Sequence, residues 1–77
     1  MSWQATITDP DEIKVFKALD TEKGNWRTVW GIARQTGLPE DRVAGILTKY
    51  NLTLTRLADV PSISGSALVG LIEKVGA

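Results

Sequence analysis

The sequence predicts a single α+β domain, mainly helical, in which three helices are followed by a C-terminal β-hairpin. Apolar residues recur at helical spacing in three segments before residue 51, each opening with residues that favour a helix start, and an alternation of period two begins at Leu52. A chain of 77 residues has the size of one small domain. We therefore expect one domain over residues 1–77, made of an extended leading segment (1–8), a three-helix core (9–51) and a hairpin (52–75).

The first helix is predicted to begin at Asp9 and to end near Leu19. Asp9 is placed to accept hydrogen bonds from the amides of the first turn, Pro10 fits that turn, and Glu12 completes a capping box. The expected buried stripe has a spacing of three and consists of Ile13, Phe16 and Leu19, with Val15 or Ala18 beside it.

Two short extended segments are expected outside the hairpin. In residues 1–8, apolar Trp3, Ala5 and Ile7 alternate with polar residues, which indicates an extended segment against the domain or a loose tail. Residues 20–25 are polar and contain a glycine, so they form a surface connection. A short strand at Trp26 and Arg27 follows this connection.

Two further helices are predicted on either side of a turn at Gly37. Thr28 is placed as the N-cap of the first, and Gly37 ends it because glycine adopts left-handed dihedral angles easily. Leu38 fills the turn, and Pro39 opens the next helix. Its buried stripe consists of Val43, Ile46, Leu47 and Tyr50.

The last third of the chain predicts two strands. Residues 52–55 alternate like a strand, residues 55–60 continue it, and residues 61–65 have the composition of a turn. Residues 66–75 fit a returning strand, but Leu68, Leu71, Ile72 and Val75 also lie at helical spacing. We favour the strand, because Gly70 would cost a helix about 1 kcal/mol and Val69 and Ile72 are β-branched.

The composition argues against an enzyme. The chain contains no Cys and no His, so we expect no metal site, no cofactor and no small-molecule substrate. The acidic pairs at 11–12 and 40–41 are explained as helix-start residues. We find no signal peptide and no apolar run near the length of about 20 residues that spans a membrane, which predicts a cytoplasmic protein.

Residues 28–47 (TVWGIARQTGLPEDRVAGIL) resemble the helix-turn-helix of the winged-helix superfamily. The stretch from Leu54 through Gly65 to Ile72 is similar to the wing hairpin of that superfamily. The resemblance implies a three-helix winged helix-turn-helix fold in which the second helix of the motif enters the DNA major groove and the wing contacts the backbone. The residues placed to contact DNA are then Arg34, Arg42, Gly45, Thr48, Lys49, Arg56, Ser62 and Ser64.

The charge pattern makes this DNA binding weak and sensitive to salt. Nine basic residues balance nine acidic ones, although residues 23–59 carry six bases against three acids. Glu40 and Asp41 stand where a phosphate would otherwise bind. For Arg42 and Lys49, DNA contact and simple solvation are equally good interpretations. We expect a monomer, because the chain lacks a long additional helix for dimerisation.

Docking to another protein is the alternative function, with Trp30, Ala44 and Gly45 as the contact residues. The predicted buried face of the helix after Thr28 consists of Val29, Ile32, Ala33 and Thr36, and Trp30 points away from it. An exposed tryptophan is typical of interface hot spots. Alternatively, Trp30 packs within the domain on Trp3, Ile7 or Trp26 and has no role in binding; we favour this interpretation. The module could be free-standing or part of a longer protein.

Overall fold

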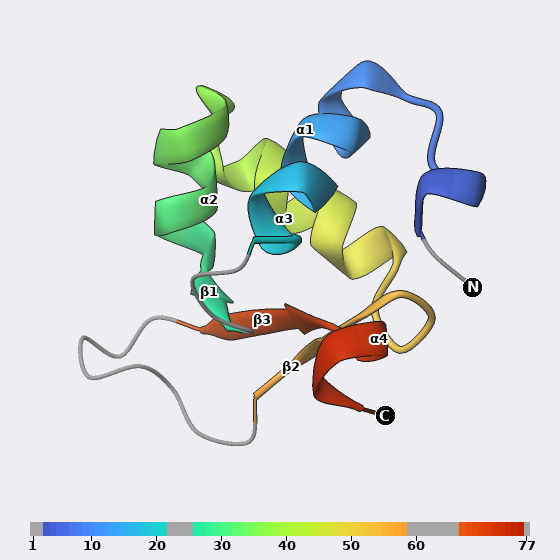
Figure 1. Cartoon of the computed structure of the whole chain (residues 1–77). Helices are drawn as coiled ribbons and strands as arrows, with labels where there is room; N and C mark the ends of the chain where they lie inside the picture. The colour runs from blue at the N-terminus through green and yellow to red at the C-terminus, as the bar shows by residue number, and fades with distance from the viewer. Residues whose placement is uncertain (1–2, 22–25, 59–66, 77) are drawn as a thin grey trace.

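The chain folds with three helices packed together on one side of a small antiparallel sheet (Figure 1). The computed structural model describes residues 3–21, 26–58 and 67–76. Within them the elements are η1 (Trp3–Ala5), α1 (Pro10–Leu19), β1 (Arg27–Thr28), α2 (Val29–Thr36), α3 (Glu40–Lys49), β2 (Thr55–Leu57), β3 (Leu68–Leu71) and α4 (Ile72–Val75). The described residues thus form a small, mainly helical α+β fold with four α-helices and one three-stranded sheet.

The predicted helix boundaries are confirmed where local capping sets them. The Asp9 carboxylate accepts hydrogen bonds from the backbone amides of Asp11 and Glu12, and Thr28 Oγ1 accepts one from the amide of Gly31 at 3.0 Å. Gly37 has φ 77° and ends α2 in the left-handed conformation, as expected. These short-range contacts set the start of α1 and both ends of α2.

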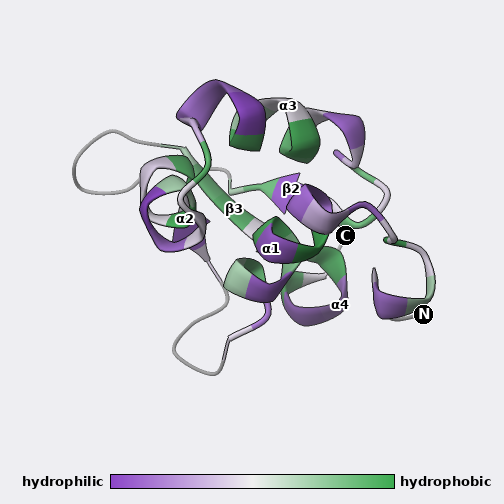
Figure 2. Cartoon of the chain, turned by 90° about the horizontal axis from the view of Figure 1, so that it is seen from above, coloured by the Kyte–Doolittle hydropathy of each residue, from purple (hydrophilic) through white to green (hydrophobic). Residues whose placement is uncertain are grey.

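The core lies between α1, α2, α3 and the sheet. Phe16 and Leu19 of the stripe predicted for α1 are fully covered, whereas Ile13 is only partly buried. In α3, Val43, Ile46 and Leu47 are buried as predicted, and Tyr50 at its end is half-buried. Figure 2 shows the hydrophobic turns of α3 on the side toward the sheet and its hydrophilic turns on the outer side. Val69 and Leu71 of the central strand β3 form the sheet side of the core.

The described part of the leading segment begins with a helical turn, which corrects the expectation of an extended segment or a loose tail for residues 3–5. Residues 3–5 form the single-turn helix η1, and Trp3, only 5% exposed, lies 5.6 Å from the Phe16 ring. The indole Nε1–H donates to the Asp20 carboxylate at 3.0 Å. The hydrogen-bonded tryptophan therefore holds the segment in the core, in a conformation that its alternating pattern does not predict.

The sheet has the order β1-β3-β2, with both pairings antiparallel. The predicted strand at Trp26 and Arg27 is present one residue later, as β1. The hairpin pairs Thr55 with Leu71 and Leu57 with Val69. The predicted turn at 61–65 lies outside the described residues.

The expected strand at 52–54 is wrong. Leu52 adopts φ 65°, and the amides of Thr53, Leu54 and Thr55 all donate to the carbonyl of Tyr50. The segment is a compact turn after α3, so that β2 begins only at Thr55. Local hydrogen bonds to a single carbonyl override the alternating pattern.

The returning strand is confirmed for residues 68–71, whereas residues 72–75 form the helix α4 instead. The amide of Ile72 makes the last ladder bond, to the carbonyl of Leu54, and the turn at Leu52 leaves β3 no partner strand beyond it. In α4 the backbone makes its hydrogen bonds within the helix instead, as from the Gly76 amide to the Ile72 carbonyl. The three-helix expectation is therefore corrected to four α-helices in the described residues.

Both ends of the described chain attach to Asp20, the residue that caps the C-terminus of α1. Its carboxylate accepts from Trp3 Nε1 and, at 3.0 Å, from Lys74 Nζ, which also donates to the Thr21 carbonyl. The hydrogen bond from Trp3 and that from Lys74 lower the pKa of Asp20. Over the described ranges, no helix is long and apolar enough to cross a membrane.

Candidate functional site

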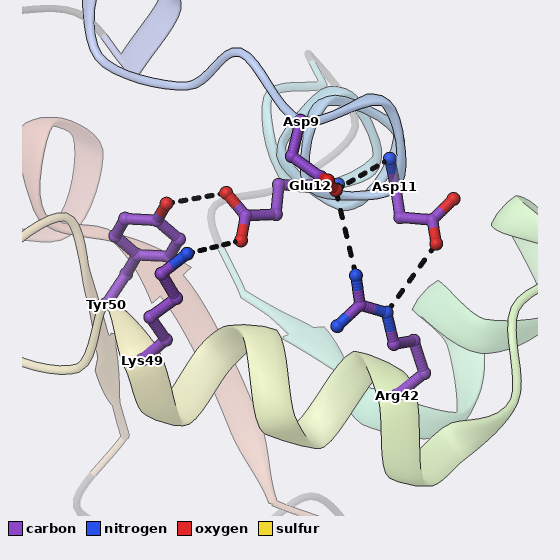
Figure 3. A network of polar contacts seen from close by, with 6 residues as sticks. All are labelled: Asp9, Asp11, Glu12, Arg42, Lys49 and Tyr50. Carbon is purple, nitrogen blue, oxygen red and sulfur yellow. Dashed lines mark hydrogen bonds and ion pairs between the residues drawn. The ribbon is translucent and has the colours of Figure 1, made fainter.

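The two cations of α3 point toward acidic residues of α1, as Figure 3 shows. Lys49 Nζ donates to Glu12 Oε2 at 2.8 Å, and the Tyr50 hydroxyl donates to Glu12 Oε1. Arg42 lies 3.7 Å from the Asp9 carboxylate and 3.5 Å from that of Asp11. Two residues expected to contact DNA thus join α3 to the start of α1.

Glu12 is the centre of this network and is 5% exposed. Burial raises the pKa of Glu12, but the hydrogen bonds from Lys49 and Tyr50 outweigh that effect, so its pKa lies below the ordinary value. The bond to Glu12 raises the pKa of Lys49 and also that of Tyr50. The expected capping-box role of Glu12 is corrected, since its carboxylate serves α3 and only its amide takes part in the cap.

The outer side of α3 carries small or neutral residues. Ala44, Gly45 and Thr48 are exposed there, as the sequence predicts. A Cβ atom added at Gly45 would meet no atom within 4 Å. Since Arg42 and Lys49 are the basic residues of α3, this side of the helix offers surface for close contact but no positive charge.

A groove of about 160 Å³ runs between α3 and the sheet. Ala44 and Leu47 of α3 face Leu57 of β2 and Val69 of β3 across it, and Leu57 is 52% exposed. Thr48, Asn51 and Arg56 supply polar atoms at the same groove. The full lining consists of Val29, Ala44, Leu47, Thr48, Asn51, Thr55, Arg56, Leu57 and Val69.

Ala44, Thr48 and Arg56 are among the contact residues predicted from the sequence, but the sequence does not predict the groove that joins them. Leu57 was the signal that could have found it, because it alternates with Thr55 and so shares the face of β2 that looks toward α3. Nothing in the local pattern gives the separation between α3 and the sheet, which creates the space.

Trp30 is 54% exposed, so the expectation that Trp3, Ile7 or Trp26 covers it is wrong. Trp3 and Ile7 belong to the core instead, and η1 lies on the opposite side of the molecule from α2 (Figure 1). The guanidinium carbon of Arg34 lies over the Trp30 ring, 4.8 Å from its centroid.

Of the remaining predicted site residues, Arg56 is described by the structure, whereas Ser62 and Ser64 are not. Arg56 lies over the Trp26 ring at 5.8 Å and donates to the Gly76 carbonyl at 3.5 Å, so it is engaged with the domain itself. In the part of the chain that the structure describes, no group of three Asp, Glu, His or Cys side chains is arranged to hold a metal ion.

The described residues therefore bring together an ion-paired helix α3, a mainly apolar groove beside it and an exposed tryptophan on α2. A comparison with protein families, with curated proteins and with solved structures finds no match for this chain.

Proposed function

We propose that the chain is a non-enzymatic docking module of the winged-helix type, which binds a partner protein by taking one apolar side chain into the groove between α3 and the sheet. The order of a helix, a helix-turn-helix and an antiparallel β-hairpin supports the winged-helix relationship. The groove itself carries the proposal for function.

The dimensions and the lining of the groove suit a single side chain. Its volume of about 160 Å³ is close to that of an engineered cavity of about 150 Å³ that binds benzene in another protein. Leu47 and Val69 are buried at its base, whereas Leu57 is half exposed at its rim. A ring or branched aliphatic group placed here would cover Leu57 and be surrounded by the polar rim typical of protein interfaces.

The charges favour a protein partner over DNA. Arg42 and Lys49 pair with Asp9, Asp11 and Glu12 at the start of α1, so part of their positive charge is balanced within the domain. The exposed start of α3 is acidic, with Glu40 and Asp41. The outer side of α3 therefore lacks the positive field on which nucleic-acid binding depends.

The groove can be tested with 4-methylphenol, a mimic of an aromatic side chain, titrated into ¹⁵N-labelled protein. We expect saturable amide shifts confined to groove residues such as Ala44, Leu57 and Val69. Ala44→Leu should abolish them by filling the groove, whereas Gly45→Ala, on a neighbouring position outside the lining, should leave them unchanged. Shifts that are scattered over the domain, or that persist in Ala44→Leu, would contradict the proposal.

Double-stranded DNA is the second candidate, favoured by the exposed Gly45 and Thr48 on a helix that follows the Gly37 turn. Each phosphate contact contributes about −0.9 to the log-log salt slope, so a slope near −4 requires Arg42 and Lys49 to leave α1. If DNA is the ligand, Glu12→Gln should release Lys49 and tighten the binding of a mixed-sequence duplex. No salt-dependent shifts at Gly45 and Thr48 would leave protein docking as the function.

A further inference from the structure

The exposed face of α2 carries a tryptophan and an arginine one helical turn apart, outside the lining of the groove. Trp30 is 54% exposed, and the guanidinium of Arg34 lies over its ring at 4.8 Å. We propose that this pair binds an acidic segment of the partner protein, in which a carboxylate lies next to an apolar side chain. The inference rests on the proposed docking role but names a separate contact and the chemistry of the partner.

The donors of Arg34 are open to such a carboxylate. Among the described residues, Arg42, Lys49 and Lys74 pair with carboxylates, and Arg27 donates to the Ala18 carbonyl and to Gln35. For Arg34 the interaction found in these same ranges is with the Trp30 ring alone. A stacked guanidinium keeps its N–H groups at its edge, where they fit the two oxygens of a carboxylate.

The contact with Trp30 also favours carboxylate binding. The guanidinium carbon of Arg34 lies 4.8 Å from the ring centroid, and this contact restricts the arginine side chain, so less conformational entropy is lost when a carboxylate binds. The part of the indole that Arg34 leaves in solvent provides apolar area beside the charge. A ligand that matches both features needs an acidic group and an apolar group side by side.

The charge of α2 is consistent with an anionic ligand. The helix, VWGIARQT, has no acidic residue, whereas α1 and α3 both have two acids in the first turn. Trp30 lies in the first turn of α2, at the positive end of the helix dipole. The attraction toward a carboxylate is thus not reduced by an acidic side chain on the same helix.

One guanidinium suits a peptide better than a nucleic acid. Binding of a polyphosphate depends on several Lys or Arg residues along its path, and α2 supplies Arg34 only. The next helix begins with exposed Glu40 and Asp41, which repel a continuous run of phosphates. One or two carboxylates on a partner protein match the number of donors on this face.

A phage-displayed library of random dodecapeptides, selected on the full chain, tests the inference. We expect enrichment of sequences in which Asp or Glu adjoins Leu, Phe or Trp. For the synthesised peptides, Arg34→Gln and Trp30→Ala should each weaken binding by about tenfold or more, since each removes one half of the pair. Arg34→Lys keeps the positive charge but removes the planar guanidinium group that binds both carboxylate oxygens, so it should give an intermediate loss of affinity.

The controls separate this contact from the groove and from the fold. Lys17→Gln removes an exposed cation of α1 and should leave the affinity unchanged. Peptides that bind Ala44→Leu normally but fail on Arg34→Gln would support the α2 contact even if the groove proposal fails. Amide spectra of each variant show whether the fold is retained.

Four outcomes would overturn the inference, three of them in the peptide selection and one with a nucleic acid. The selected peptides could lack acidic residues, they could bind Arg34→Gln as well as the natural chain, or no sequence could be enriched over a selection on Arg34→Gln. Tighter binding of an oligothymidine strand than of any peptide, lost in the Trp30→Ala variant, would assign the same pair to single-stranded nucleic acid instead.

Discussion

Replacing Glu12 by Gln tests the network that joins α1 to α3. The carboxylate is 5% exposed and accepts from Lys49 and Tyr50. A hydrogen bond to a charged group contributes about 1.5 to 3 kcal/mol and a neutral one about 0.5 to 1.5, so the Tyr50 bond alone should lose about 1 to 1.5 kcal/mol. In a domain of this size that loss lowers the Tm by about 4 to 12 °C.

The effect of Glu12→Gln on the Tm should depend on pH, and the lowered pKa of Glu12 sets the direction of that dependence. The pKa of Glu12 is lowered in the folded state, so its contribution to the free energy of unfolding is complete above the ordinary pKa of 4.5 and is lost as the pH falls through the folded-state pKa. Protonated Glu12 has nearly the shape of Gln. The Tm values of the natural chain and of Glu12→Gln should therefore differ at neutral pH and converge in acid.

Thermal unfolding followed by circular dichroism from neutral to strongly acidic pH measures both effects. Glu73→Gln, an exposed acid of α4, is the matched control and should show little change at neutral pH. Tyr50→Phe completes a double-mutant cycle, in which the two losses should not add, because they share one hydrogen bond. Equal Tm values at neutral pH, or a difference that persists in acid, would refute the reasoning.

Further predictions concern glycines and tryptophans. Gly45→Ala should raise the free energy of unfolding by about 0.5 to 1 kcal/mol in urea, because the added Cβ meets no atom within 4 Å; a lower midpoint would contradict this. Gly37→Ala should lower it by about 1 to 2 kcal/mol, because φ is 77°, and an unchanged urea midpoint would count against the left-handed turn. Trp3→Ala should cost about 3 to 5 kcal/mol and Trp30→Ala about 0.5 or less in thermal unfolding; the reverse order would show that the burial of the two indoles has been exchanged.

The helix boundaries could be predicted because their causes are local. Asp9 bonds to amides two and three residues ahead, Thr28 to an amide three ahead, and Gly37 ends α2 through its own dihedral angles. Such contacts join residues only two or three positions apart, so a short stretch of sequence is enough to predict them. The same is true of the apolar stripe of α3, which the 3.6-residue period determines.

The candidate site depends on contacts that local patterns do not contain. Glu12 has the right spacing for a capping box, yet its partners Lys49 and Tyr50 lie 37 and 38 residues away. A buried carboxylate gains more from a cation and a hydroxyl than from one more backbone amide. The acidic partners of Arg42, Asp9 and Asp11, are likewise distant in the sequence and lie at the start of α1.

The C-terminal helix was missed because strand length depends on a partner. The pattern of residues 66–75 fits both a strand and a helix, and the left-handed turn at Leu52 decides between them by ending the ladder at Ile72. A non-glycine residue with positive φ gives no signal in the sequence. Sequence reasoning therefore found the hairpin but not the point at which it stops.

Asp20 offers one anchoring point to segments that are more than seventy positions apart along the chain, Trp3 and Lys74. Loss of either neighbour removes a donor from the carboxylate that holds the other, so fraying at one terminus should loosen the opposite one. Amide protons of η1 and α4 are then expected to exchange with solvent as one cooperative unit rather than independently. In this small domain the C-cap of α1 therefore couples the stability of η1 to that of α4.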